Sequence, residues 1–376
     1  MKPTEFVKVN AQFWGEHLRE ISGHLPVSHR RELAGPLLYP RMLVLTETPD
    51  WNIVELVGIS REYRSLEVRR QKVASVEEYF GVGSGDSAVV TLPGENLFKD
   101  ATVATHDGRR ELEARFPGVR AMIGQEFSGP GDDLLKFAPG NYSTFDRTLL
   151  VHSAGSALRA HWVFFALAIH RSEPAEKYLD FLRNFAAAAP HTDPVGTLSV
   201  PRADDGADLQ GAVFASTYLA HEVPNSTVDQ FLSANEDFLL TAFDATKLIR
   251  QPHLEWQSGD EVALTPDFVL ERADGSHVVG DLRLPLADGV KGKKHRRTTT
   301  LADGVAQLAR VTEYFDDADN RAFASTKYGV EITAPRKLVV IGSADVVDAA
   351  QLKAAEGVEV LDYDTILRLH LAATTS

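Results

Sequence analysis

The sequence predicts an α/β protein in two parts, an α+β N-terminal region over residues 1–215 and a C-terminal domain over residues 216–376. Short runs of valine, leucine and isoleucine, separated by glycine, proline and aspartate, fill residues 40–104 and predict strands and hairpins. A polar stretch at residues 190–211 contains several prolines and glycines and predicts a linker or long loop. Beyond it, helical and strand patterns alternate, which is typical of a mixed sheet flanked by helices.

The N-terminal region adds a helical pattern to these strands. Over residues 154–188, apolar residues recur at three- and four-residue spacing, and Pro174 separates two predicted helices. His152, His161 and His170 lie in or beside this segment, and we assign them to packing or to a helix surface. We expect the domain boundary in residues 190–211 or just after them.

The C-terminal domain has the predicted order α-β-β-β-α-β-α-β-α. An apolar stripe predicts a helix over residues 226–243, capped by Ser226 or Thr227. Asp274 and Gly275 predict a two-residue hairpin turn between two of the strands. The remaining predicted elements are strands at 248–256, 263–271, 277–284, 337–341 and 358–361, a helix over 300–315, an alanine-rich helix, and a last helix that begins at Asp364.

The composition excludes several classes of function. The chain of 376 residues has no cysteine, which excludes disulfides, thiolate zinc sites, iron–sulfur clusters and cysteine nucleophiles, and fits a reducing compartment. Its net charge of −14 means that any contact with nucleic acid must come from a local basic patch. The longest apolar run, Trp162 to Ile169, is too short to span a bilayer, and residues 1–20 contain no apolar signal core. We therefore expect a cytoplasmic protein that does not associate with membranes.

Two carboxylates converge on one end of the predicted hairpin. Asp267 follows Pro266 at the start of a strand, and Asp281 lies on the next strand, across the turn. Because side chains alternate along a strand, Asp281 and Arg283 share one face. Two carboxylates at a sheet edge suit Mg²⁺ or Mn²⁺, and such a metal binds phosphate oxygens and lowers the pKa of bound water. Arg283 would stabilise the charge on a phosphate beside it.

The neighbouring helices carry two further candidates. Glu236 lies at the margin of the apolar stripe of the helix before the strands, where it would be a third metal-side carboxylate. Gln307 precedes Leu308 on the helix after the strands, from which it would reach the same edge and position water or phosphate. Each residue also has a plainer explanation. Glu236 alone is typical of a solvated helix glutamate, Gln307 of a surface amide, and either aspartate of a turn cap or an ordinary ion pair.

A basic loop follows the second aspartate. Residues 281–310 contain seven basic residues against three acidic ones, within an acidic chain. A basic loop beside a carboxylate site suits binding to a phosphate backbone, although a solvated flexible loop remains the open alternative. The candidate nucleic-acid-binding residues are Lys291, Lys293, Lys294, Arg296 and Arg297.

Pro266-Asp267 followed by Asp281-Leu282-Arg283, within the order α-β-β-β-α-β, resembles the PD-(D/E)xK nuclease superfamily. The chain from about Ser226 is similar, more specifically, to the Shedu-type nuclease domain of bacterial anti-phage defence proteins. The segments that carry this second resemblance are Asn235-Glu236-Asp237-Phe238-Leu239, Val279-Gly280-Asp281-Leu282-Arg283-Leu284-Pro285, Ala306-Gln307-Leu308 with Tyr314, and the strand-turn-helix at 358–364.

The resemblance implies a restriction-endonuclease-like C-terminal fold and a metal-dependent DNA endonuclease with Mg²⁺ or Mn²⁺ as its cofactor. It implies Asp267, Asp281 and Glu236 as metal ligands, with Arg283 and Gln307 as further catalytic residues. It also implies a homo-oligomer, regulation by the N-terminal region and a phage-derived trigger. The chain departs from the family in having Asp281 where glutamate is usual and Arg283 where lysine is usual. Because a guanidinium does not deprotonate in proteins, Arg283 is a poor general base, but it can stabilise phosphate charge.

Two other functions stay open. Without the usual lysine, the domain could be a catalytically degenerate nuclease fold that acts as a nucleic-acid-binding or protein-binding sensor. A small-molecule enzyme with its site in the N-terminal region is the weaker alternative, because no residues there converge on one chemistry. Trp51 and Trp162 are better explained as core or interface aromatics.

Overall fold

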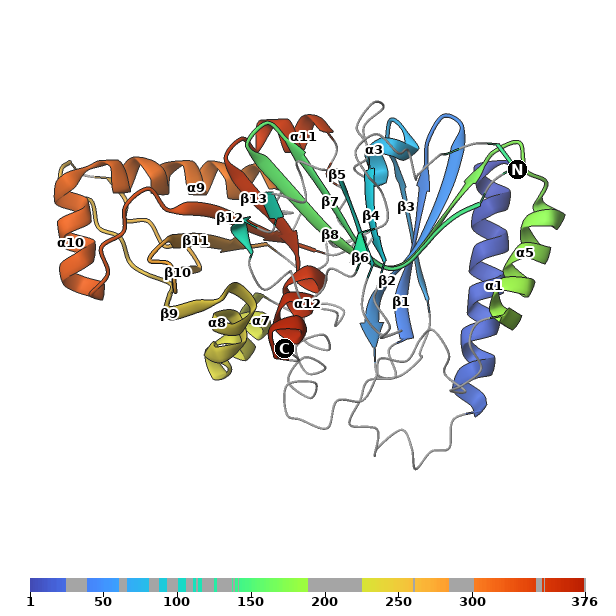
Figure 1. The fold of residues 1–376 in the computed structure, drawn as a ribbon, viewed down its shortest axis with the longest axis horizontal. Helices are drawn as coiled ribbons and strands as arrows, with labels where there is room; N and C mark the ends of the chain where they lie inside the picture. The colour runs from blue at the N-terminus through green and yellow to red at the C-terminus, as the bar shows by residue number, and fades with distance from the viewer. Residues whose placement is uncertain are drawn as a thin grey trace. The chain divides into compact units, whose positions relative to one another are not determined.

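The chain forms two compact units of mixed helix and strand. Figure 1 labels their helices and strands. The first unit comprises residues 1–106, 123–150 and 162–221, and the second comprises residues 107–122, 151–161 and 222–376. The computed structural model describes residues 1–24, 39–60, 66–80, 88–92, 101–105, 111–112, 114–116, 125–126, 137, 139–140, 142–188, 225–259, 261–283, 301–342, 347 and 349–374.

The two units do not coincide with the two predicted domains, which follow one another along the chain and meet after residue 215. The last change of unit falls between His221 and Glu222, close to that position. Residues 107–122 and 151–161, however, belong to the second unit although they lie in the N-terminal half of the chain. Residues 158–160 pair in parallel with residues 359–361. Such a long-range pairing leaves no local signal in the sequence, so the sequence did not predict it.

The first unit is built mainly from strands, and the strands expected over residues 40–104 are confirmed. β1 pairs with β2 in antiparallel fashion and with β3 in parallel, and β2 pairs with β8. Helices α1 and α5 lie side by side in this unit, where the rings of Phe6 and Tyr178 stack at 5.4 Å (Figure 1). The elements are α1 (Pro3–His24), β1 (Tyr39–Glu47), β2 (Trp51–Ser60), β3 (Glu67–Lys72), α3 (Val76–Phe80), β4 (Ala88–Leu92), β5 (Ala101–Thr105), β6 (Gln125–Glu126), β7 (Tyr142–Ala154), β8 (Ala157–His170) and α5 (Ala175–Ala188).

The helical prediction for residues 154–188 is wrong in its first half. This part forms the long strand β8, and a helix begins only after Pro174, at α5. Residues 165–169 are buried, and β8 has strand neighbours on both sides. A strand that is covered on both faces has a continuous apolar sequence, which periodicity cannot distinguish from a buried helix. Trp162 is buried in this strand, in agreement with its assignment to the core.

The second unit is a mixed sheet flanked by helices, as the sequence predicts. Its strands lie in the order β9-β10-β11-β12-β13, followed by the first residues of β8. The first three strands are antiparallel and the others are parallel. The elements are α7 (Asn225–Ala234), α8 (Glu236–Phe243), β9 (Ala245–Arg250), β10 (Phe268–Arg272), β11 (His277–Leu282), α9 (Leu301–Asp316), α10 (Ala318–Tyr328), β12 (Arg336–Ile341), α11 (Ala349–Ala354), β13 (Val358–Asp362) and α12 (Tyr363–Thr374).

Most differences from the predicted elements lie at their ends. The expected helix over residues 226–243 is divided at Asn235, and β10 begins at Phe268 rather than at residue 263. Helix α10 was not predicted, because its sequence is polar and lacks an apolar stripe. Its N-cap is Asp317, whose side chain accepts hydrogen bonds from two backbone N–H groups of the first turn. The predicted turn at Asp274-Gly275 is confirmed in position, with Gly275 at φ 79°, but its loop comprises residues 273–275 rather than two residues, because the N–H of Arg272 donates to the carbonyl of Ser276 at 2.8 Å.

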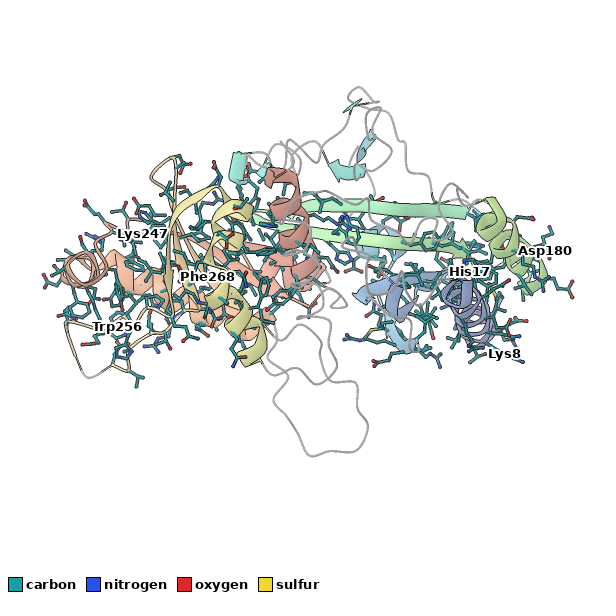
Figure 2. All side chains as sticks on the ribbon, turned by 90° about the horizontal axis from the view of Figure 1, so that it is seen from below. Lys8, His17, Asp180, Lys247, Trp256 and Phe268 are labelled. Carbon is teal, nitrogen blue, oxygen red and sulfur yellow. The ribbon has the colours of Figure 1, made fainter. Side chains whose placement is uncertain are left out.

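The segment between β9 and β10 has little regular structure but packs closely on the helices. The ring of Trp256, labelled in Figure 2, meets Tyr314 of α9 edge-on at 5.3 Å. The Tyr314 hydroxyl donates to the carbonyl of Glu255 at 3.2 Å, and the N–H of Gln257 donates to Asn320 at 2.7 Å. These contacts fix the path by which the chain reaches Asp267 and the start of β10.

Helices cover both faces of this sheet. On one face, Val279 and Val339 pack in the same core as Leu308 of α9. On the other face, Phe268 lies 6.5 Å from Phe243 of α8, and α8 packs on α12. Figure 1 shows α9 and α12 on opposite sides of the strands. Within the described residues, no helix is both long enough and apolar enough to cross a membrane.

Gly280 leaves room for a buried aromatic ring, and an alanine there is expected to destabilise the fold. A Cβ atom at residue 280 would lie 2.0 Å from the Phe268 ring, which is itself 1% exposed. We expect Gly280→Ala to lower the free energy of unfolding by about 1–3 kcal/mol, measured by urea denaturation. The double variant Gly280→Ala/Phe268→Leu should recover part of the loss, because the smaller side chain makes space. A double variant whose loss of unfolding free energy equals the sum of the losses in the two single variants would contradict this packing.

Candidate active site

The end of β11 brings two of the predicted residues together under α9. Asp281 and Arg283 point to the α9 face of the sheet, and Arg283 Nη2 donates to Asp281 Oδ2. Both residues are buried, with 2% and 8% of their surfaces exposed. The Arg283 backbone is anchored on both sides, since its N–H donates to Val340 at 2.8 Å and its carbonyl accepts from the Tyr363 hydroxyl at 2.7 Å.

Asp267 lies beside this pair, at the start of β10. Its backbone N–H donates to the carbonyl of Gly280 at 3.1 Å, and its Oδ2 accepts from the N–H of Leu282 at 2.6 Å. The Asp267 carboxylate therefore contacts the backbone of the residue that directly follows Asp281. The sheet thus brings both predicted carboxylates to the ends of adjacent strands.

The charge of Asp281 is balanced within the protein. Burial raises the pKa of Asp281 above its ordinary value, whereas the Arg283 guanidinium opposes that rise. Asp303, in the first turn of α9, adds a further repulsion that also raises the pKa of Asp281. A buried carboxylate in this setting needs a nearby cation to stay ionised.

Helix α9 forms a close-fitting cover over Arg283. The guanidinium donates through Nη2 to Gln307 Oε1 at 3.2 Å, and Gln307 Nε2 donates to the carbonyl of Thr265 at 3.4 Å. A Cβ atom at Gly304 would lie only 2.9 Å from Arg283 Nε, so the backbone of α9 packs directly against this side chain. Arg283 Nε itself is buried and makes no hydrogen bond to any residue that the structure describes. Gln307 therefore joins the cluster, as the sequence predicts.

Glu236 is the predicted site residue that the structure does not bring to this cluster. It is exposed in the first turn of α8, the helix that covers the opposite face of the sheet from α9. Its neighbour Phe238 stacks on His370 of α12 at 4.2 Å, and Asp237 acts electrostatically on the same histidine. The predicted nucleic-acid-binding residues Lys291, Lys293, Lys294, Arg296 and Arg297 lie outside the described residues.

The two carboxylates fit magnesium better than a metal that needs many protein ligands. Among the described residues there is no cluster of three or more histidine, aspartate or glutamate side chains that could hold a metal. Mg²⁺ usually keeps several waters and takes only one or two carboxylates together with phosphate oxygens. Asp267 and Asp281, both hard oxygen donors on adjacent strand ends, match that requirement.

A second buried charge cluster lies on the same face of the sheet, and the sequence did not predict it. Asp362 is fully buried at the end of β13 and accepts from His161 Nδ1 and from the N–H of Thr365, the latter at 2.7 Å. Arg159 Nη1 lies 3.6 Å from the same carboxylate. Although burial alone raises the pKa of Asp362, His161 and Arg159 hold that pKa below its ordinary value. His161 is thus a packed residue, as expected, but it lies on strand β8 rather than on a helix and contacts the buried Asp362 carboxylate.

The strand register explains why this cluster could not be found from sequence. Asp281 pairs with Val339, Val339 with Val360, and Val360 with Arg159, so Asp281 and Arg159 share a face and a row across four strands. Only the pairing of β13 with β8 brings Arg159 and His161 next to Asp362. The sole local signal is Asp362 before α12, a position typical of a helix cap.

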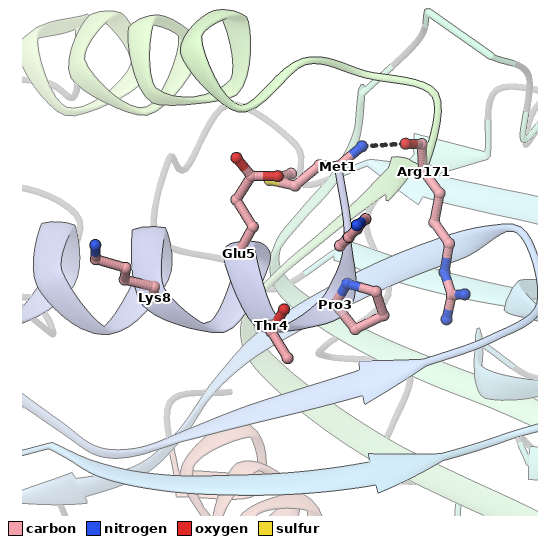
Figure 3. Close-up of a pocket in the computed structure, with 7 residues that line it drawn as sticks. Met1, Pro3, Thr4, Glu5, Lys8 and Arg171 are labelled. Carbon is pink, nitrogen blue, oxygen red and sulfur yellow. Dashed lines mark hydrogen bonds between the residues drawn. The ribbon is translucent and has the colours of Figure 1, made fainter.

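The first unit has an open pocket at the start of α1 (Figure 3). Lys2, Lys8 and Arg171 line it together with one carboxylate, Glu5. The N-terminal amine of Met1 donates to the backbone carbonyls of Arg171 and Glu173, the latter at 2.9 Å. No residue predicted for the active site lines this pocket.

Comparison of the whole chain with protein-family models, curated proteins and solved structures finds no match. Fold and site define an α/β protein with two aspartates, Asp267 and Asp281, at the ends of adjacent strands of a mixed sheet.

Proposed function

We propose that this chain is a metal-dependent DNA endonuclease that hydrolyses phosphodiester bonds in a prokaryotic anti-phage defence system. One observation carries the proposal. Asp267 and Asp281 lie on adjacent strand ends, with Arg283 on the Asp281 face and Gln307 above it on the covering helix. This is the layout expected from the resemblance to PD-(D/E)xK nucleases, in a unit with the matching order of helices and strands.

Asp267 and Asp281 would hold Mg²⁺ or Mn²⁺. The bound metal lowers the pKa of a water molecule and neutralises charge on a phosphate oxygen. Arg283 donates hydrogen bonds to the phosphate and stabilises its negative charge, but it does not take up a proton. Gln307 is a positioning residue, because its amide holds the guanidinium on one side and the Thr265 carbonyl on the other. The proposed ligand set contains these two aspartates and leaves out Glu236.

The remaining parts of the proposal follow from the resemblance and from charge. DNA would be bound through the basic stretch from Lys291 to Arg297, because the chain as a whole is acidic. We also propose a cytoplasmic homo-oligomer whose N-terminal region regulates the nuclease in response to a phage-derived trigger. We propose in addition that the second unit has a restriction-endonuclease-like fold.

DNA cleavage by the full chain tests this function. Linear and closed circular DNA are incubated with Mg²⁺, with Mn²⁺ or with EDTA, beside the variants Asp267→Ala and Arg283→Lys. We expect cutting that requires metal, is lost in Asp267→Ala and is retained or raised in Arg283→Lys. The surface variant Glu313→Gln is the matched control on α9, since Glu313 is exposed. Cutting that persists in EDTA or in Asp267→Ala would contradict the proposal.

The second candidate function is a degenerate nuclease fold that binds nucleic acid or protein without cutting. The buried ion pair between Asp281 and Arg283 favours it, because it places a cation of the protein on a predicted metal ligand. This candidate predicts DNA binding in a gel-shift assay that is equally strong with Mn²⁺ and with EDTA. It also predicts no cleavage by Arg283→Lys.

A further inference from the structure

Arg283 forms an ion pair with Asp281 in the structure, whereas the proposed function requires it to bind a phosphate. In the structure its guanidinium neutralises Asp281, and this ion pair is almost completely buried. In the proposed nuclease, Asp281 binds a divalent cation and Arg283 binds a phosphate. The inference below rests on that proposed function and concerns how the site passes from the first arrangement to the second.

A metal cannot simply join the existing pair. Arg283 Nη2 contacts Asp281 Oδ2, so a divalent cation on this carboxylate would meet a fixed positive charge. A guanidinium keeps its positive charge in proteins, so this repulsion persists while the two groups stay in contact. The guanidinium must therefore move away from Asp281 or gain an anion of its own.

Among the described residues, Asp281 is the carboxylate that forms an ion pair with Arg283. The guanidinium cannot move toward α9, because Gly304 already lies so close that a Cβ there would be 2.9 Å from Nε. Its other side-chain partner, Gln307 Oε1 at 3.2 Å, is neutral. Asp303 acts on Asp281 but is exposed at the start of α9. A ligand can supply a new anionic partner, and a phosphate oxyanion matches the planar donor geometry of a guanidinium.

We infer that Arg283 couples metal binding to phosphate binding, so that a divalent cation and a phosphodiester bind this site cooperatively. Without a phosphate, Arg283 occupies Asp281 and weakens metal binding. With a phosphate, the guanidinium pairs with the ligand and leaves the carboxylate to the metal. Because binding free energies are linked, the metal must tighten DNA binding by the same factor by which DNA tightens metal binding.

This coupling also assigns a role to Gly304. The glycine is a positioning residue that lets the guanidinium pack directly against α9 while it pairs with Asp281. A methyl group at residue 304 would meet Arg283 Nε at 2.9 Å and both Val339 methyls at 3.1 Å. Since the guanidinium ends a flexible side chain, it is the group that shifts. Gly304→Ala should therefore weaken the ion pair while both charges remain.

Two binding measurements on the full chain test the inference. The affinity for a short fluorescent DNA oligonucleotide is measured by anisotropy with Mn²⁺ and with EDTA, and the affinity for Mn²⁺ alone by electron paramagnetic resonance. In the wild type we expect Mn²⁺ to tighten DNA binding by about 5-fold or more. In Arg283→Gln the effect of Mn²⁺ on DNA should fall below about 2-fold, while Mn²⁺ alone binds more tightly than in the wild type.

Two further variants complete the design. Gly304→Ala should change both affinities in the same direction as Arg283→Gln, and it keeps the test valid if Arg283→Gln folds poorly. Arg183→Gln is the matched control, because Arg183 is exposed in α5 and pairs with Asp180 at the surface. Equal stimulation of DNA binding by Mn²⁺ in wild type, Arg283→Gln and Gly304→Ala would overturn the inference and leave the nuclease proposal standing. A wild type that binds no Mn²⁺, with or without DNA, would overturn both.

Discussion

Asp281→Asn is expected to abolish metal-dependent cleavage and to weaken Mn²⁺ binding by more than about 100-fold. Mutation of residues that only hydrogen-bond to a metal ligand already lowers metal affinity by about 10–100-fold. The reason is that the variant removes the negative charge from one of two proposed ligands. The same change leaves the buried Arg283 cation without its counter-charge. Removing one partner of a buried ion pair costs about 3–5 kcal/mol, so the free energy of unfolding should fall by that amount.

The double variant Asp281→Asn/Arg283→Gln separates these two effects. It should regain most of the stability, because no buried charge is left unpaired, yet it should remain inactive. Glu313→Gln is the control, since it removes an exposed carboxylate from the same helix, α9. Urea denaturation and DNA cleavage are the two measurements. A double variant that is as unstable as Asp281→Asn would contradict the ion-pair account of this residue.

Asp362→Asn should produce the second large effect, a loss of about 3–5 kcal/mol in the free energy of unfolding. Asp362 is fully buried, and its carboxylate contacts both Arg159 and His161. The asparagine would take the negative charge away from the Arg159 guanidinium and the His161 ring, which both contact this carboxylate. Asp316→Asn is the matched control, because Asp316 is exposed at the end of α9. A loss no larger than that of the control would contradict the role of this cluster.

The contribution of Asp362 should also depend on pH in a defined direction. Its pKa is lowered in the folded protein below the ordinary value of 3.8, so the folded state binds this proton less readily than the unfolded state. The stabilisation is therefore complete above that ordinary value and is lost as the pH falls through the folded-state pKa. Among the described residues, His161 and Arg159 of β8 and Thr365 of α12 contact the Asp362 carboxylate. The difference in unfolding free energy between wild type and Asp362→Asn should therefore narrow below about pH 4. A difference that stays constant at low pH would contradict this role of Asp362.

Local patterns were sufficient for most of the second unit. The turn at Asp274-Gly275 sets the register of β10 and β11, and this register brings Asp267 next to the strand that carries Asp281. Alternation along β11 then places Asp281 and Arg283 on one face. Gln307 could be predicted because it lies beside the apolar stripe of the helix that covers this face.

What the sequence did not reveal depends on contacts between distant segments. The apolar stripe of α8 shows that Glu236 lies on a packed helix, but not which face of the sheet the helix covers. The parallel pairing of β8 with β13 joins segments from opposite halves of the chain, and only this pairing brings His161 to Asp362. The same pairing moves residues 151–161 into the second unit, which a linear division of the chain could not foresee.

Metal-dependent nicking of closed circular DNA by the full chain, measured for the wild type and Asp267→Asn side by side, tests the nuclease assignment most directly. Asp267 suits this test because it is only half-buried and contacts the backbone of β11. Circular dichroism verifies that the variant is folded. The account predicts nicking by the wild type with Mg²⁺ or Mn²⁺, none with EDTA, and none by Asp267→Asn under any condition. Nicking by Asp267→Asn at the wild-type rate would contradict it.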